Sequence, residues 1–451
     1  MNKKHYYREM ITIGLPITLQ SIFQAGYSFI DQIMVGQLGA VSIAGSGLGG
    51  KFSSLVIVTL SAIATVASIL IAQYRGKKDV KGISQSFYLS GIIAVFTMLL
   101  FLLPSVFVPE TLMKLYTQDQ QTFQMGAMYL RVIALGFLPM TGTLMLSAYL
   151  RSMECSKYPL YTSIVAMFCN IAGNYLFIFG KFGLPEMGLK GAAISTTFSR
   201  FLEFVLLLCF FYRIKKEKNL ILKKSKIWNK GLAKTMFIIM IPILLNEFLW
   251  SLGENIYTAV YARLGTDALA AMTMTGPLQG LFVGMFTGIS SAAVVMIGVR
   301  LGKNEFEESY QIAKIMMRVS FLGSVFVGGM LMLLAGFYVN LFRVEQQVKQ
   351  LAVKLLFVFA LFLFVKVLNM VISGGIFRSG GKTKITLVID LIGTWGFGIP
   401  LALISGIVLK LPVYQVYAIL SLEELVRLLI GFVVFQKKTW MQNLVKEEKK
   451  N

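Results

Sequence analysis

Residues 14–39 read GLPITLQSIFQAGYSFIDQIMVGQLG, an almost wholly apolar stretch that holds a single carboxylate, Asp31. As a helix this stretch extends about 39 Å, which is enough to cross the hydrocarbon core of a bilayer. A charge at membrane depth costs roughly 2.5–3.5 kcal/mol on insertion scales, so an intramembrane acid predicts a functional site. The alternative is that Asp31 lies near the outer interface and is hydrated. The apolar residues Ile33, Met34 and Val35 continue beyond it, which favours the functional interpretation.

The composition indicates an integral membrane protein. Of the 451 residues, 56% are hydrophobic and 14% are charged, whereas soluble domains carry about 25% charged residues. The net charge of +22 could suggest nucleic-acid binding. However, the basic residues are confined to short segments between apolar runs, a pattern typical of membrane topology. We therefore expect the lipid bilayer as a partner and no nucleic acid.

Cysteine and histidine usage leaves little room for enzymatic chemistry. Cys155, Cys169 and Cys209 lie in or beside apolar runs and are odd in number, so they predict no disulfide framework. His5 is the only histidine and lies in the polar N-terminus, which excludes a histidine-based metal site or catalytic triad in the membrane. We expect a protein that is not an enzyme and has no cofactor.

Apolar stretches of spanning length predict an all-α fold with twelve transmembrane helices. Their approximate ranges are 12–36, 44–72, 84–108, 123–149, 159–180, 189–212, 236–261, 270–298, 313–340, 352–377, 385–408 and 413–435. With the N-terminus placed inside, the inner segments hold 28 Lys and Arg residues and the outer segments hold nine. The positive-inside rule then places both termini in the cytoplasm of a multi-pass protein of the plasma (inner) membrane.

An internal repeat divides the chain into two halves. When the second half is laid over the first, Pro16 falls on Pro242 and Gly39 on Gly265, and after a slip of one position Arg151 falls on Arg378. Each half then contains six helices, and because six is even, both halves start from the same side of the membrane. We expect two six-helix bundles related by a pseudo-two-fold axis along the membrane normal. The predicted parts are a bundle at 1–212, a basic cytoplasmic linker at 213–235, a bundle at 236–436 and a cytoplasmic tail at 437–451.

Four motifs resemble the multidrug and toxic compound extrusion (MATE) family of transporters. They are IDQIMVGQLGAVSIAG at 30–45, YLRSMECSKYP at 149–159, RLGTDALAA at 263–271 and GGIFRSGGKTK at 374–384. The resemblance covers nearly the whole chain. It implies a V-shaped pair of six-helix bundles that exports organic cations and other amphipathic compounds in exchange for H⁺ or Na⁺. We expect such a protein to be a monomer.

The same resemblance suggests a coupling-ion site. Asp31 matches the acid that the family keeps in its first helix, and the family's partner residues lie on the fifth helix. Here that helix carries Asn170 and Asn174, four residues apart and so on one face. Many relatives have an aspartate where Asn174 stands, which leaves one acid with amide oxygens. Such a set could bind Na⁺, or Asp31 could carry a proton; the alternative role of the asparagines is interhelical hydrogen bonding, worth roughly 0.6–2 kcal/mol.

The second half offers Glu247, Glu254 and Lys366 as further candidates. Glu247 and Glu254 are seven residues apart, two helical turns, and so face one way. Some relatives place a cation-binding glutamate in this helix, but counting from Pro242 puts the expected register nearer Trp250, so the correspondence is imperfect. Tyr257, and not an acid, aligns with Asp31. Glu247 and Lys366 lie at matched depths from the inner ends of their helices, which makes an intramembrane ion pair geometrically possible.

Two other functions remain open. A flippase for lipid-linked oligosaccharide or polysaccharide has a similar bundle plan, and a wide basic cavity for phosphate would favour it. A membrane-embedded transferase would need a cluster of His or Asp near one interface, and the sequence contains no such cluster.

Overall fold

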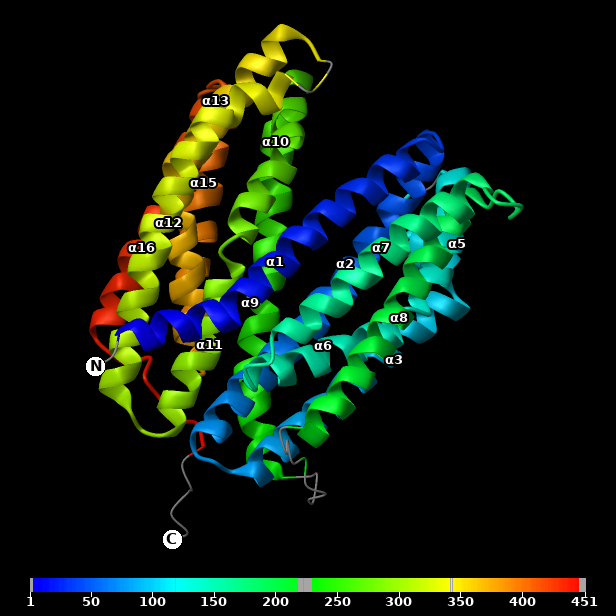
Figure 1. Cartoon of the computed structure of the whole chain (residues 1–451). Helices are drawn as coiled ribbons and strands as arrows, with labels where there is room; N and C mark the ends of the chain where they lie inside the picture. The colour runs from blue at the N-terminus through cyan, green and yellow to red at the C-terminus, as the bar shows by residue number, and fades with distance from the viewer. Residues whose placement is uncertain are drawn as a thin grey trace. The chain divides into compact units, whose positions relative to one another are not determined.

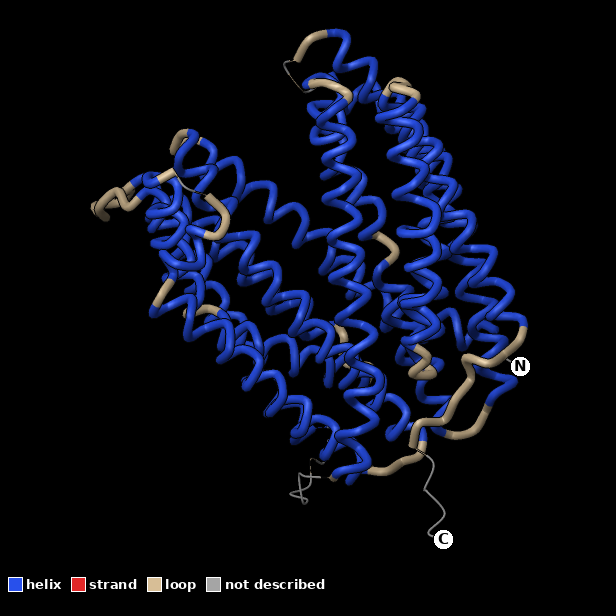
Figure 2. The backbone as a smooth tube through the Cα atoms, turned by 180° about the vertical axis from the view of Figure 1, so that it is seen from behind, coloured by secondary structure: helices blue, strands red, loops and turns tan. Residues whose placement is uncertain are grey.

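The computed structural model describes residues 3–117, 119–217, 222, 229–340, 342 and 344–445, and within these residues all regular structure is helical (Figure 2). The elements are α1 (Lys3–Gly36), α2 (Ala40–Gly76), α3 (Val80–Phe107), α4 (Pro109–Lys114), α5 (Gln120–Ala134), α6 (Phe137–Ser152), α7 (Lys157–Phe179), α8 (Gly188–Glu217), α9 (Lys230–Arg263), α10 (Thr266–Gly284), α11 (Thr287–Gly302), α12 (Phe306–Asn340), α13 (Gln346–Asn369), η1 (Met370–Phe377), α14 (Thr383–Asp390), η2 (Leu391–Gly398), α15 (Ile399–Leu403), η3 (Ile404–Val408) and α16 (Val413–Gln436). The expected all-α class is confirmed.

These helices form the twelve predicted spans. Nine continuous stretches of the described chain are long and apolar enough to cross a membrane, and the bent pair α5 and α6 makes a tenth. The remaining two are α1, with 34 residues, and α16, with 24 residues. Both carry ionisable side chains within their apolar sequence, Asp31 in α1 and Glu423, Glu424 and Arg427 in α16.

The chain forms two compact units. The first bundle is residues 19–234, and the second bundle is residues 1–18 together with 235–451. The division falls inside α1, whose first half packs with the second bundle. The expected domain boundaries at 212 and 236 stay a prediction, and residues 218–221 and 223–228 of the linker lie outside the described residues.

Direct contacts attach the first half of α1 to the second bundle. The buried guanidinium of Arg300 donates from Nη1 and Nη2 to the two carboxylate oxygens of Glu9, each at 2.7 Å. Tyr6 donates a hydrogen bond to Glu308. Gly14 lies directly against Gly288, where a Cβ on either residue would meet the backbone of the other. The bidentate ion pair and the close backbone approach hold the first half of α1 in the second bundle, although the sequence repeat assigns it to the first half of the chain.

The second bundle has an extensive apolar core. In Figure 1 α12 lies beside α13, and α13 also packs against α10 and α16. Its core includes Leu355, Phe359 and Leu363 of α13, all of them 1% exposed or less. In the first bundle α2 packs against α3, α5 and α6, and α7 packs along α8. A Cβ at Gly45 of α2 would lie 2.9 Å from the Cβ of Met125, so glycine there permits the close approach of α5.

The backbone repeats the pattern seen in the sequence. Positive φ angles occur at Gly39 (90°) and Gly265 (117°), at Lys78 (59°) and Asn304 (65°), and at Glu154 (59°) and Gly381 (69°). The members of each pair correspond to one another in the register that lays Pro242 over Pro16, with the last pair after the slip of one position. The turns at 77–79 and 303–305 also share three equivalent backbone hydrogen bonds. The two halves are therefore duplicated in their turns as well as in their helix count.

Candidate functional site

The first bundle brings together the three residues of the predicted coupling-ion site. Asn174 of α7 donates from Nδ2 to Asp31 Oδ1 of α1 at 2.7 Å and to Asn170 Oδ1 at 3.1 Å. Asn170 donates from Nδ2 to Thr196 Oγ1 of α8 at 3.2 Å. Both asparagines are 1% exposed or less. Asp31 therefore has a buried amide as its hydrogen-bond partner, and the three predicted residues lie together. The role of Asp31 in ion coupling stays a prediction.

One buried polar atom of this site has no hydrogen-bond partner. Asn174 Oδ1 is buried and accepts no hydrogen bond from the described residues. A buried acceptor without a donor costs about 1–3 kcal/mol, which a cation or a proton donor at this oxygen would offset. Tyr27, Tyr129 and Arg200 lie close enough to Asp31 to interact with its charge. The site thus combines a carboxylate, an unpaired amide oxygen and one resident positive charge.

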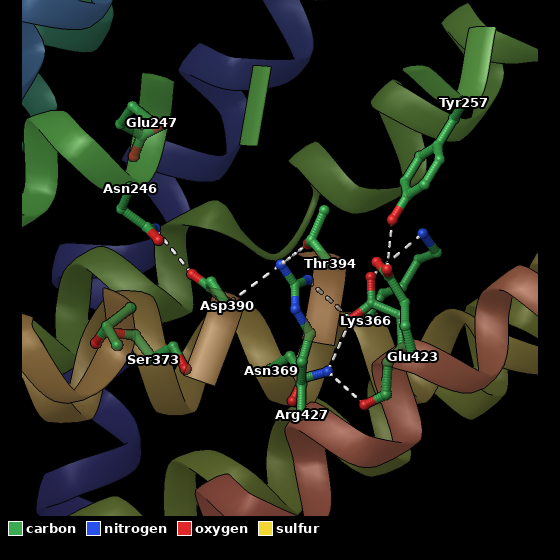
Figure 3. Close-up of polar contacts among 12 residues, drawn as sticks. Asn246, Glu247, Tyr257, Lys366, Asn369, Ser373, Asp390, Thr394, Glu423 and Arg427 are labelled. Atoms are coloured by element: carbon green, nitrogen blue, oxygen red, sulfur yellow. Dashed lines mark hydrogen bonds and ion pairs between the residues drawn. The ribbon is translucent and has the colours of Figure 1, made fainter. Parts of the chain in front are cut away.

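The second bundle contains a larger network, which Figure 3 shows. At one end Arg427 of α16 pairs with Asp390 of α14 at 3.2 Å and donates to Thr394 of η2 at 3.0 Å. Asn246 of α9 donates from Nδ2 to Asp390 Oδ2 at 2.8 Å. Arg427 also lies 3.4 Å from Glu424, one turn before it on α16. The residues at this end of the network come from four helical elements, α9, α14, η2 and α16.

At the other end the network reaches two more carboxylates. Lys366 Nζ of α13 lies 3.4 Å from Glu424 Oε1, and Asn369 donates to Glu424 Oε2 at 2.8 Å. Tyr257 of α9 donates from its hydroxyl to Glu423 Oε2 (Figure 3). Glu254 is exposed, yet it lies close enough to Lys366, Glu424 and Arg427 to interact with their charges. Lys366 and Glu254, two of the predicted residues, thus belong to one network.

The expected ion pair between Glu247 and Lys366 is wrong. Glu247 Oε1 lies 3.3 Å from Arg378 Nη2, while Lys366 binds Glu424. Matched depth sets the height of a residue but not the direction of its side chain. Side chains tilt toward the N-terminus of their helix, so Glu247 on α9 and Arg378 after η1 lean toward one another, whereas Lys366 leans away. Glu247 therefore lies outside the network that contains Lys366.

Sequence reasoning missed Asp390, Glu423, Glu424 and Arg427. All four lie inside the apolar stretches expected at 385–408 and 413–435. Like Asp31, they are ionisable side chains at membrane depth, the feature that predicts a functional site. Across the described part of the chain, no group of three or more His, Cys, Asp or Glu residues could hold a metal ion.

Two duplicated helical bundles with ionisable clusters among their membrane-spanning helices define a polytopic membrane transporter. The MatE family model matches residues 16–176 and 242–404, one match in each half. The chain therefore belongs to the MatE family, a family of transporters and not of enzymes.

Similar proteins agree with this assignment. The chain is 24% identical over 442 residues to "Probable multidrug resistance protein NorM" of Thermotoga maritima, covering 97% of this chain and 94% of that relative. It is 25% identical to "Uncharacterized transporter YisQ" of Bacillus subtilis, covering 96% and 95%. Among solved structures it is similar to "Crystal structure of MATE in complex with MaL6", with a TM-score of 0.88, 18% identity and 96% coverage of both chains. A structure titled as an outward-facing MATE family transporter also gives 0.88, with 18% identity, covering 98% of this chain and 97% of that chain.

Proposed function

We propose that the protein is an antiporter that exports amphipathic or cationic organic compounds in exchange for H⁺ or Na⁺. The observation that carries this proposal is the Asp31 carboxylate bound to a buried asparagine with an unpaired oxygen. Several relatives are named as probable multidrug resistance proteins, which supports the substrate class. We place the protein in the plasma membrane as a monomer with both termini in the cytoplasm.

Either coupling ion suits the chemistry of the first-bundle site. Na⁺ prefers hard oxygen ligands, and Asp31, Asn170 and Asn174 can present a carboxylate and two amide oxygens. A proton on Asp31 would instead turn the carboxylate into a donor. A flip of the Asn174 amide, which exchanges its oxygen and nitrogen, would then bring Oδ1 to accept that proton, satisfying the unpaired acceptor. In both cases the cation removes a charge that is costly to keep at membrane depth.

The network in the second bundle supports cation coupling independently. Its carboxylates are those of Glu254, Asp390, Glu423 and Glu424, and its bases are Lys366 and Arg427. If all are ionised, the network carries two more negative than positive charges. Such an excess in a low-dielectric bundle favours uptake of a proton, a metal cation or a cationic substrate group. Glu254, the exposed carboxylate, is where we expect that cation to enter.

Substitution of Asp31 by Asn tests the proposal, because it keeps the side-chain shape and removes the charge. In everted vesicles with matched protein content, where the cytoplasmic face of the membrane is outside, wild type should accumulate a cationic dye in the lumen under either a proton or a sodium gradient, and Asp31→Asn should not. Equilibrium dye binding by the variant should persist, because coupling requires a difference in ion affinity between conformations and not substrate affinity alone.

Asp119→Asn is the matched control. Asp119 is an exposed cap residue whose carboxylate accepts from the backbone of Thr122 at 2.8 Å, and Asn caps helices equally well. Its efflux should equal that of wild type. Normal efflux by Asp31→Asn would move the coupling site to Glu254 and the second bundle, and failure of wild type to use either gradient would contradict the antiporter itself.

A further inference from the structure

A stack of three aromatic rings joins the start of α12 to the end of α16 in the second bundle. Tyr310, one turn into α12, stacks on Phe435 with ring centroids 5.0 Å apart and an angle of 21° between the planes. Phe435 stacks in turn on Trp440, with centroids 5.8 Å apart and an angle of 10°. Phe435 and Trp440 are buried and Tyr310 is half-buried, so the Tyr310 ring is the accessible end of the stack.

Two lysine ammonium groups lie over the Tyr310 ring. Lys314 Nζ is 4.3 Å from the ring centroid, and Lys438 Nζ is 4.4 Å from it. The ring attracts each ammonium group, but two like charges this close also repel one another. The carboxylate beside them is that of Glu307, with Oε2 3.4 Å from Lys438 Nζ. Two ammonium groups against this one carboxylate leave an excess of one positive charge.

The chain on both sides of Lys438 is anchored. Before it, α16 ends at Gln436, next to the stacked ring of Phe435. After it, Trp440 is fully buried, and its Nε1 donates to the carbonyl of Phe435 at 3.3 Å. Asn443 then donates to Asn304 Oδ1 at 2.9 Å, in the turn before α12. Lys438 is therefore held against α12 by the fold.

The lysine pair lies where α12 leaves the membrane. α12 has 35 residues and extends about 52 Å, which exceeds a hydrocarbon core of about 30 Å. Its first turn carries Glu307 and Glu308, so this end of the helix belongs to the headgroup region. Beyond it, both helices expose apolar side chains, Leu322, Val325 and Phe326 on α12 and Leu429, Phe432 and Val433 on α16. Such surfaces on spanning helices contact the acyl chains of lipids.

The first bundle lacks the equivalent pair. In the register that lays Pro242 over Pro16, Tyr310 corresponds to Ser84 and Lys314 to Tyr88. Ser84 is buried and donates to the carbonyl of Val80 at 2.8 Å. The shared fold therefore does not require an aromatic ring and a lysine at these two positions.

We propose that Lys314 and Lys438 bind the phosphate group of one anionic phospholipid, whose acyl chains lie along the exposed apolar side chains of α12 and α16. A phosphodiester carries one negative charge, which matches the excess positive charge. By accepting hydrogen bonds of about 2.8 Å from both ammonium groups, it offsets their repulsion. The adjoining apolar surface favours a lipid over a free phosphate ion, which has no chains to place there. In the orientation proposed above, this lipid belongs to the cytoplasmic leaflet.

The test is saturable binding of tritiated phosphatidylglycerol to the purified full-length chain in detergent. A lysine beside an anionic lipid contributes about fivefold to binding, so Lys314→Gln with Lys438→Gln should raise the Kd about 25-fold. Glu307→Gln removes the carboxylate that competes with the lipid for Lys438, so the Kd should fall about fivefold. This opposite shift, at an exposed residue, decides the question if the double variant fails to fold.

Two unlabelled competitors identify the source of the phosphate. Phosphatidylcholine with the same acyl chains should displace the probe more weakly than phosphatidylglycerol, because its choline group cancels the phosphate charge. Inorganic phosphate should leave the probe bound at the concentrations at which phosphatidylglycerol displaces it. Equal displacement by phosphatidylcholine would show unspecific lipid contact, and equal displacement by inorganic phosphate would show an ion site; either result overturns the proposal.

Lys384→Gln is the matched control. Lys384 is an exposed lysine in the first turn of α14 in the same bundle, and its loss should leave the Kd unchanged. Equal weakening by Lys384→Gln and by Lys438→Gln would show a general attraction of the lipid to basic residues and would overturn the site.

This binding measurement uses no ion gradient, so its outcome is separate from that of the antiporter. A chain that binds phosphatidylglycerol as described, yet moves no dye under either gradient, contradicts only the proposed function. Gradient-driven dye movement with unaltered lipid binding in the Lys314 and Lys438 variants contradicts only the lipid site.

Discussion

Glu247 and Arg378 form an ion pair that ties α9 to the chain after η1, with 3.3 Å between Oε1 and Nη2. We predict that Glu247→Gln and Arg378→Met are energetically coupled, with an interaction of roughly 0.5–3 kcal/mol, as expected for residues in contact. The physical reason is that either single change leaves a charge without its partner in a low-dielectric bundle. Thermal unfolding of the singles and the double in one detergent measures the coupling.

Lys366→Met is the control in this cycle. Lys366 binds Glu424 and not Glu247, so its effect on unfolding should add to that of Glu247→Gln. Additive behaviour of Glu247 with Arg378, or coupling of Glu247 with Lys366, would contradict the pairing.

At this scale, prediction from sequence succeeded where a residue type and its spacing were sufficient. Asn170 and Asn174 lie four residues apart on α7; Asn174 donates a hydrogen bond to Asp31 and another to Asn170. It failed for Glu247 and Lys366, because residue depth follows from counting along a helix but side-chain direction depends on which way each helix runs. The ionisable residues of α16 could have been found by the rule that identified Asp31.

The turns between helices, at the scale of elements, yield a prediction free of packing effects. Gly39 precedes α2 with φ 90° and ψ 171°, a conformation almost restricted to glycine, and a Cβ there would meet nothing within 4 Å. Gly39→Ala should therefore lower the free energy of unfolding by roughly 1–3 kcal/mol through backbone strain alone. The melting temperature in detergent, at constant efflux per folded molecule, is the measurement.

Lys78→Gly tests the same backbone preference in the opposite direction, because it introduces glycine at a positive φ angle. Lys78 adopts φ 59° in the turn after α2, where glycine carries no Cβ penalty. The substitution should leave the melting temperature unchanged or raise it. Equal destabilisation by both changes would mean that these turns are held by side-chain contacts and not by backbone preference.

Helix interruptions could not be predicted from hydrophobicity. The fourth span is broken by 49° between α5 and α6, and the tenth and eleventh spans contain the π-helical segments η1, η2 and η3. Mean apolarity places a span but is insensitive to the shift from i→i+4 to i→i+5 hydrogen bonds. The glycines at 374, 375, 393, 396 and 398 lie within η1 and η2, and glycine-rich sites are where helices commonly depart from regularity.

The two halves of the whole molecule have kept their turns and changed their buried ionisable residues. Under the repeat, Asp31 corresponds to Tyr257, and Thr196 corresponds to Glu423. Of these two positions, the one on α1 carries the acid in the first half, and the one on α16 carries it in the second half. In the second half Tyr257 donates a hydrogen bond to Glu423. The repeat was visible in the sequence because paired prolines inside α1 and α9 and paired glycines before α2 and α10 stand out from the apolar residues. The different placement of the buried charges required the structure.

The orientation of the chain in the membrane rests on the 28 inner against nine outer basic residues and gives the last prediction. In a variant without Cys155, Cys169 and Cys209, a cysteine at Thr117, between α4 and α5, should react with an impermeant maleimide from outside intact cells only. A cysteine at Lys303, in the turn between α11 and α12, should react only in inside-out vesicles. Lys224, in the linker, lies outside the described residues and should behave like Lys303. Labelling on the opposite sides would reverse the topology and, since everted vesicles define the direction of dye movement, would also turn the proposed export into uptake.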